Sequence, residues 1–195
     1  MTKAERTRQF IIEQSAPIFN TKGVAATSMS DIMEATRLAK GSLYVHFENK
    51  DELAYCAVDY NLDNFSKKFM VAITKHQKAS NQLYAYLDFL SDPENPPVIG
   101  GCPILNFGME ADDTNPVILR KVNKAINYVI QQLAGIVSQG IATGEFRKSF
   151  NASEFATRTF ALIEGAILIA RVSRNRDKMD QIVRMIKKEI EEQLQ

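Results

Sequence analysis

Apolar residues recur every three or four positions along most of this 195-residue chain, a spacing typical of amphipathic helices. Near the N-terminus, residues 27–53 divide that pattern into shorter pieces. Met29, Ile32 and Met33 form a brief apolar stripe, and in the next short stretch only Leu43 is placed to face inward. The pattern therefore predicts two short helices joined by a tight turn, the second with a polar outer face.

Residue types at the ends of these pieces support the same boundaries. Ser28 and Asp31 have the spacing of a capping box, in which each side chain accepts a hydrogen bond from the other residue's backbone. Asn49 and Glu52 repeat that spacing where a longer helix is expected to begin. The order helix, turn, helix is the plan of the helix-turn-helix motif.

The second short helix exposes a face suited to an anionic surface. Beside Gly41 it carries Lys40, Ser42, Tyr44 and His46, and it is too short and too polar to be a core element. DNA is therefore the first hypothesis for its partner.

The remaining chain predicts helices almost throughout. The expected helices cover about residues 50–75, 81–90, 116–143 and 153–173, with a short helix that begins at Pro103 and a last helix that runs from about Asp177 and includes Leu194. A loop rich in Pro and Gly occupies residues 91–103. No strand pattern competes. We therefore expect an all-α fold, with a DNA-binding domain over residues 1–48 and a larger helical domain over residues 49–195.

Composition narrows the class of protein. Hydrophobic residues make up 45% of the chain, which is enough for a sizeable core, and the net charge is only +1. Residues 1–50 hold seven Lys and Arg against five Asp and Glu, a net charge of +2, so any basic surface is local. No apolar run has the length of a membrane span, and no secretory leader is apparent, so we expect a cytoplasmic protein without a membrane partner.

Catalytic and metal-binding patterns are missing from the sequence. Cys56 and Cys102 lie far apart, and with His46 and His76 they make no metal-ligand spacing. There is no nucleophile paired with a base, no phosphate-binding loop and no defined pair of carboxylates. We therefore expect no enzyme activity, no metal and no cofactor.

A resemblance sharpens the DNA hypothesis. The first quarter of the chain resembles the DNA-binding domain of the TetR family of bacterial repressors. The matching residues are Arg8, Ile11, Phe19, Gly23, Thr27, Ile32, Ala35, Lys40, Gly41, Ser42, Leu43, Tyr44, His46, Phe47, Lys50 and Leu53. The resemblance implies a three-helix DNA-binding domain followed by a helical domain for effector binding and dimerisation.

Two positions depart from the family pattern. Arg37 stands where the family usually has glycine in the turn, and a positive φ there would strain it by about 1 kcal/mol. Ala39 replaces the usual serine cap, at a cost of roughly 1 kcal/mol of local helix stability.

The resemblance also implies roles in DNA binding. Lys40, Tyr44, His46 and Lys50 are expected to contact phosphates, and Gly41 to let the backbone come close. Ser42 and Ala39, with Thr36 or Arg37, are expected to face base edges, because base contacts specify a site while phosphate contacts position the protein. Thr27 and Ser28 would direct a helix N-terminus at the DNA backbone.

Two C-terminal helices are candidates for a dimer interface. The stretch 160–172 has a broad apolar surface with small residues, and the last helix is strongly amphipathic. TetR relatives dimerise through two such helices from each subunit, which form a four-helix interface. The candidates are Ala161, Gly165, Leu168, Ile169, Val172, Ile182, Met185, Ile186 and Ile190. Packing of both helices inside one monomer is the alternative.

Residues of the middle helices could line a pocket for a small-molecule effector. The candidates are Phe65, Phe69, Tyr84, Leu87, Asn106, Phe107, Glu110, Tyr128, Phe160 and Glu164. Asn106 and Glu110 lie one helical turn apart, and a carboxylate in the apolar helix of Glu164 needs a partner or a ligand. Ordinary core packing of the aromatic residues is the alternative. Residues 100–116 also resemble a TetR subgroup related to the Bacillus YfiR and LmrA proteins, which fixes no effector.

Together these features predict a repressor that binds a palindromic operator as a homodimer and is released by a small-molecule effector. The alternative is a helical interaction module, or an activator, that works through a protein partner without a small-molecule inducer.

Overall fold

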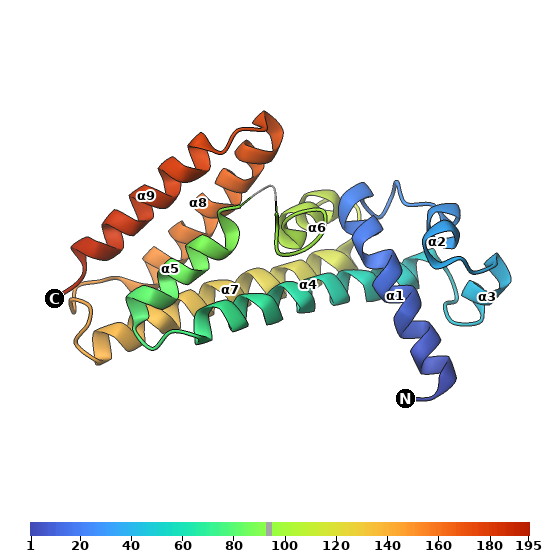
Figure 1. Ribbon diagram of the computed structural model, residues 1–195, viewed down its shortest axis with the longest axis horizontal. Coiled ribbons are helices and arrows are strands. Elements are labelled where there is room, and N and C mark those ends of the chain that lie inside the picture. The colour runs from blue at the N-terminus through green and yellow to red at the C-terminus, as the bar shows by residue number, and fades with distance from the viewer. Residues whose placement is uncertain (93–94) are drawn as a thin grey trace. The chain divides into compact units, whose positions relative to one another are not determined.

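The computed structural model describes residues 1–92 and 95–195, and these residues form helices connected by short turns (Figure 1). The described residues contain no β-strand, and their β-structure is limited to an isolated antiparallel bridge between Phe146 and Leu194. The helices are α1 (Lys3–Lys22), α2 (Met29–Thr36), α3 (Lys40–Tyr44), α4 (Lys50–Thr74), α5 (Ala79–Leu90), α6 (Pro103–Ala111), α7 (Pro116–Ala142), α8 (Ala152–Ser173) and α9 (Asp177–Glu192). The fold is all-α, as the periodicity predicts.

Local sequence signals explain where the first helices begin and end. Thr2 and Glu5 form a capping box at the start of α1. The helix ends at Gly23, whose φ of 87° favours glycine. The expected capping box at α2 is also formed: Ser28 Oγ accepts from the amide of Asp31 at 3.1 Å, and the Asp31 carboxylate accepts from the amide of Ser28 at 2.9 Å.

The chain divides into two compact units. Unit 1 contains residues 1–65 and 98–125, and unit 2 contains residues 66–97 and 126–195, so α4 and α7 contribute to both. This division reflects which segments of the backbone pack against one another. The functional boundary near residue 48 stays a prediction.

Unit 1 is organised around α1. The buried face of α1 includes Ile11, Ala16 and Phe19, which are all 0% exposed, and α1 packs against both α2 and α6. Ile32 of α2 and Leu43 of α3 complete the small core beneath the two short helices. Each short helix is thus anchored by one buried aliphatic side chain that the apolar pattern predicts.

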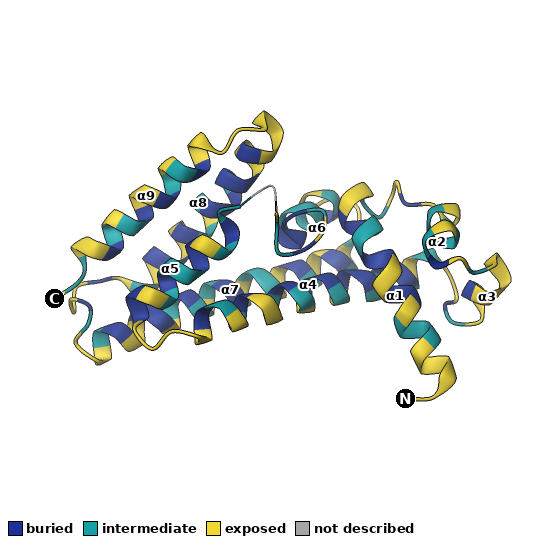
Figure 2. Cartoon of the chain, in the orientation of Figure 1, coloured by how far each residue is buried: buried dark blue, intermediate teal, exposed yellow. Residues whose placement is uncertain are grey.

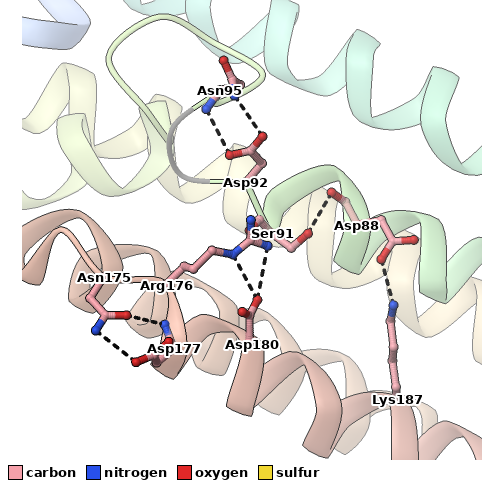
Figure 3. Close-up of polar contacts among 9 residues, drawn as sticks. All are labelled: Asp88, Ser91, Asp92, Asn95, Asn175, Arg176, Asp177, Asp180 and Lys187. Carbon is pink, nitrogen blue, oxygen red and sulfur yellow. Dashed lines mark hydrogen bonds and ion pairs between the residues drawn. The ribbon is translucent and has the colours of Figure 1, made fainter.

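Unit 2 is built on the antiparallel pair α8 and α9, with α5 against them. Buried and exposed residues alternate by turns along α9, where Met179, Val183, Ile186 and Ile190 face the core (Figure 2). Polar contacts fasten α5 to α9 at the rim of this core. Lys187 Nζ donates to Asp88 at 2.8 Å, and Arg176 donates to the carbonyl of Ser91 at 3.4 Å (Figure 3).

Among the described residues, none of the helices combines the length and the apolar character that crossing a membrane requires. The same residues contain no group of His, Cys, Asp and Glu side chains able to hold a metal ion.

Candidate nucleic-acid interface

Helix α3 is a five-residue helix attached to unit 1 by a single buried side chain. Leu43 is 1% exposed, whereas Ala39, Lys40, Gly41, Ser42 and Tyr44 are all exposed. Most of the helix surface is therefore open to solvent (Figure 2). The predicted recognition residues are brought together on this outer face.

Gly41 is not required by the packing of the protein. A Cβ added there would meet no heavy atom within 4 Å, and its φ lies outside the left-handed region. Glycine inside a helix lowers the stability of the fold by about 0.5–1 kcal/mol relative to alanine, and nothing in the packing around Gly41 requires glycine. The open space matches the expected close approach of a partner to the backbone.

A cationic side chain, Lys40, and an aromatic side chain, Tyr44, lie on α3 close to Gly41 in sequence. Lys40 Nζ lies 5.9 Å from the centroid of the Tyr44 ring, and Tyr44 is 43% exposed. His46 follows at the end of the helix and is half-buried. Lys40 and Tyr44 thus present an ammonium group and a phenol on the same side of the helix.

The turn before α3 contains the strained residue that the sequence identifies. Arg37 adopts φ 56° and ψ 26°, the left-handed conformation that glycine adopts freely, and its side chain is exposed. A non-glycine residue there costs about 1–2 kcal/mol. Ala39 begins α3 without a side-chain cap, as its methyl group dictates. Thr36 is buried, so of the two candidates for base contact in this turn only Arg37 reaches the surface.

The start of α2 is occupied by groups of the protein itself. Thr27 is buried, and its hydroxyl donates to the carbonyl of Gly23 at 2.6 Å. The Asp31 carboxylate accepts from Lys22 at 2.6 Å and from Ser28. The Lys22 ammonium and the Ser28 amide lower the pKa of Asp31 to about 2. Ser28 is exposed but caps the helix, so neither Thr27 nor Ser28 offers a free hydroxyl to a phosphate.

Lys50 holds the turn between α1 and α2. Its Nζ donates to the carbonyls of Val24 at 2.9 Å, Thr27 at 3.0 Å and Ala25 at 3.5 Å. An ammonium group has three donors, so these contacts use its capacity. This side chain ties the first turn of α4 to the α1–α2 turn, and its expected phosphate contact stays a prediction.

A second tie joins α1 to α4 through Arg8. Its guanidinium donates to Glu52 at 2.9 Å and lies 4.5 Å from the centroid of the buried Phe47 ring. The amide of Glu48 and the Arg8 guanidinium lower the pKa of Glu52. The sequence does not reveal this pair, because Arg8 and Glu52 are 44 positions apart.

Asn106 and Glu110 of α6 also hold the exit of α1. The Glu110 carboxylate accepts from the amides of Val24 at 2.8 Å and Ala25 at 2.7 Å. Asn106 Nδ2 donates to the carbonyls of Asn20 and Gly100 at 2.9 and 3.0 Å. Both residues lie on one face of α6, and that face meets the end of α1 and the α1–α2 turn; their role in an effector pocket stays a prediction.

The other effector candidates are divided between the two units. Phe65 and Phe107 are buried in unit 1. In unit 2, Phe69 is buried against Tyr86 with ring centroids 5.6 Å apart, and Tyr84 lies 5.9 Å from Lys187 of α9. The remaining unit 2 candidates are the buried Leu87 and Glu164 and the half-buried Tyr128 and Phe160. Their roles in a pocket stay predictions.

The expected dimer residues fall into two groups. Leu168, Ile169, Val172 and Met185 are 51%, 48%, 78% and 56% exposed, which is unusual for large apolar side chains. Ala161 is exposed, and Gly165 and Ile182 are half-buried. Ile186 and Ile190, however, are 2% and 0% exposed, so they pack in the core of unit 2, as the monomer alternative expects, and their place in an interface stays a prediction.

Comparison with known proteins gives matches along nearly the whole chain. Residues 11–54 match the family model described as bacterial regulatory proteins, tetR family, and residues 79–186 match the tetracyclin repressor-like C-terminal domain. The crystal structure of a TetR-family transcriptional regulator from Cytophaga hutchinsonii is 38% identical with a TM-score of 0.94, covering 100% of this chain and 98% of that one.

Curated relatives agree at lower identity. The HTH-type transcriptional repressor DhaR of Mycobacterium sp. (strain GP1) is 22% identical over 184 residues, which are 92% of this chain and 89% of DhaR. The uncharacterized HTH-type transcriptional regulator YfiR of Bacillus subtilis is 22% identical over 137 residues, which are 70% of this chain and 66% of YfiR. The YfiR match supports the expected subgroup only weakly.

Proposed function

Because the chain belongs to the TetR family of bacterial transcriptional regulators, we propose that it is a repressor that binds a palindromic DNA operator as a homodimer. Binding of a small molecule to its larger domain releases it from the operator. Such a role places the protein in the bacterial cytoplasm. No step of this function calls for a metal, a cofactor or a covalent reaction.

The exposed face of α3 is the observation that carries this proposal. Only Leu43 anchors the helix, and the outer face combines a lysine, a glycine without packing constraint, a serine and a tyrosine. In the major groove such a helix would place Lys40 and Tyr44 on phosphates and Ser42 against base edges. Gly41 would let the backbone approach the DNA without a side chain between them.

Arg37 is proposed as an additional DNA contact. Its guanidinium is exposed next to α3, and its left-handed backbone is costly for any residue except glycine. A residue that carries such strain without packing inward fits a role at a ligand-facing site. The proposal places it on a phosphate or on a base edge beside Ser42.

The exposed apolar side chains of α8 and α9 support the homodimer. Leu168 and Val172 lie one turn apart on α8, and Met185 is exposed on α9. A two-fold assembly through this face would present two copies of α3 to half-sites about 34–36 Å apart. Substituting Val172→Glu should therefore give monomers in analytical ultracentrifugation and weaken operator binding, while Arg171→Glu, at the exposed neighbouring position, serves as the charge control.

Release by an effector would act through the turn between α1 and α2. Lys50 of α4 holds its carbonyls and Glu110 of α6 holds its amides, so both helices fix the position of the DNA-reading part. A ligand that moves α4 or α6 would shift this turn. It lowers operator affinity only if it binds the DNA-free form more tightly.

A binding assay tests the proposal. Fluorescence anisotropy with duplex DNA from upstream of the protein's own gene, and with duplexes selected from a random pool, should give saturable binding of two chains per site. Lys40→Ala should weaken binding to all duplexes alike, whereas Ser42→Ala should weaken it for the preferred sequence alone. Absence of binding to every duplex would instead favour the interaction-module alternative.

A further inference from the structure

A groove in unit 2 combines lysine side chains with an apolar floor, and the proposed function assigns it no role. It encloses about 590 Å³ between the second half of α4, the end of α5 and the segment 95–97. Its lining includes Lys67, Lys68, Lys75, Val71, Phe89 and Pro96. The volume falls in the range of small-molecule sites, roughly 300–1,000 Å³.

The spacing on α4 places an apolar side chain between two cations. Lys67 and Val71 lie four residues apart on one face of α4, and Lys75 follows four residues later, in the turn directly after the helix. Val71 is 56% exposed in spite of being apolar. The two lysines are about 12 Å apart along the helix at 1.5 Å per residue, enough for a small molecule to lie between them.

Specific contacts hold the opposite wall. Lys68 Nζ donates to the carbonyl of Pro97 at 2.6 Å, and Asp92 accepts from the backbone and side-chain nitrogens of Asn95 at 3.2 and 3.1 Å. Figure 3 shows Asp92 and Asn95 facing one another, and it shows Asp88 directed at Lys187 of α9. Asp88 is thus engaged by α9, and Asp92 is engaged by Asn95, which itself lines the groove.

The ammonium groups of Lys67 and Lys75 are available to pair with an anionic ligand. Both are exposed, and neither makes an ion pair or a side-chain hydrogen bond within the part of the chain that the structure describes. Among the described residues that line the groove, none carries a carboxylate. The groove therefore presents net positive charge around an apolar surface formed by Val71, Phe89 and Pro96.

We propose that this groove binds a small amphipathic anion, a monocarboxylate with an aliphatic or aromatic body. The carboxylate pairs with Lys67 or Lys75, whose ammonium groups are point charges suited to a single anionic group. The apolar body lies on Val71 and Phe89 and gains by leaving water. This site uses none of the proposed DNA contacts, and its occupancy is measurable without DNA.

Isothermal titration calorimetry of the full chain with octanoate tests the site. A molecule with about ten non-hydrogen atoms is expected to bind with a Kd of about 0.1–1 mM. The neutral 1-octanol should bind at least about tenfold more weakly, and acetate should give no saturable heat. Raising the salt concentration should weaken octanoate binding, because the lysines are exposed.

Variants connect the binding to the groove. Lys67→Ala/Lys75→Ala should weaken octanoate binding by up to about fivefold, as expected when the single carboxylate loses its exposed ion pair with either lysine. Val71→Glu should abolish binding, since it places a carboxylate between the lysines. Lys148→Ala, at an exposed position outside the groove, is the matched control and should leave the Kd unchanged.

Three results would overturn the proposal. Equal octanoate affinity in the wild type and the double lysine variant would place the anion elsewhere, and equal affinity for octanol would remove charge recognition. Loss of operator binding in Lys67→Ala/Lys75→Ala, with the melting temperature unchanged, would assign these lysines to DNA instead. Failure of the repressor proposal alone would leave the octanoate titration intact, so the two failures are distinguishable.

Discussion

Substitution of Gly41 by alanine separates the stability of the protein from its proposed contact with DNA. The added methyl group meets no heavy atom within 4 Å, so the folded protein accepts it without strain. Alanine in a helix is favoured over glycine by about 0.5–1 kcal/mol, so the free energy of unfolding should rise by that amount. For a chain of 195 residues this corresponds to about 1–4 °C in Tm.

The same methyl group should weaken DNA binding. If the backbone of α3 lies against DNA, a carbon atom inserted at the contact costs about 1–3 kcal/mol, a loss of about five- to 150-fold in affinity. Circular dichroism melts and fluorescence anisotropy with an operator duplex measure the two effects on the same preparation. Gly135→Ala in α7 is the control, because Gly135 is exposed and also has open space around its Cα.

The control should gain stability and keep its operator affinity. Unchanged operator affinity in Gly41→Ala would refute the reasoning, because it would mean that DNA does not approach this part of α3. A lower Tm would also contradict it, since the methyl group would then be meeting the protein itself.

Three further substitutions test the surroundings of α3. Arg37→Gly should raise the free energy of unfolding by about 1–2 kcal/mol in chemical denaturation by removing the left-handed strain, and it should lower operator affinity if the guanidinium contacts DNA. Lys50→Ala should destabilise the chain by about 1–2 kcal/mol, because the carbonyls of the α1–α2 turn lose a charged donor; a Tm equal to the wild type would show that this tie is unimportant. Asp31 has its folded pKa lowered from 3.8 to about 2, so its contribution is complete above about pH 4 and is lost as the pH falls towards 2; Asp31→Asn should flatten the pH dependence of Tm in that window, and an identical pH profile would argue against the Lys22 contact.

Much of the fold follows from the sequence because its signals are local. The capping box of Ser28 and Asp31 fixes the start of α2, and the apolar periodicity fixes the order of the long helices. From the sequence, strain at Arg37 is expected if its φ is positive, and Arg37 does adopt a positive φ in the turn between α2 and α3. The outer face of α3 could be anticipated since Leu43 is its only large apolar side chain.

Other contacts of the predicted site residues join distant segments and could not be read from the sequence. Glu110 lies 86 residues from Val24 and Lys50 lies 23 residues from Thr27, so no local pattern announces that both bind the α1–α2 turn. Ile186 and Ile190 share the amphipathic stripe of Met185, and only the packing of α8 and α5 decides which of them is covered. The groove in unit 2 could not be predicted from the sequence for the same reason, because its wall at residues 95–97 is remote from α4 along the chain.

The salt dependence of operator binding tests the central claim that the exposed face of α3 contacts DNA. Binding of the full chain to its operator, followed by fluorescence anisotropy over a range of salt concentrations, gives a slope that reports the number of neutralised phosphates. Each operator holds two chains in the proposed dimer, so Lys40→Ala should flatten the slope by about two, roughly 0.9 for each lost contact, with the Tm unchanged. An unchanged slope and unchanged affinity in Lys40→Ala would contradict the account.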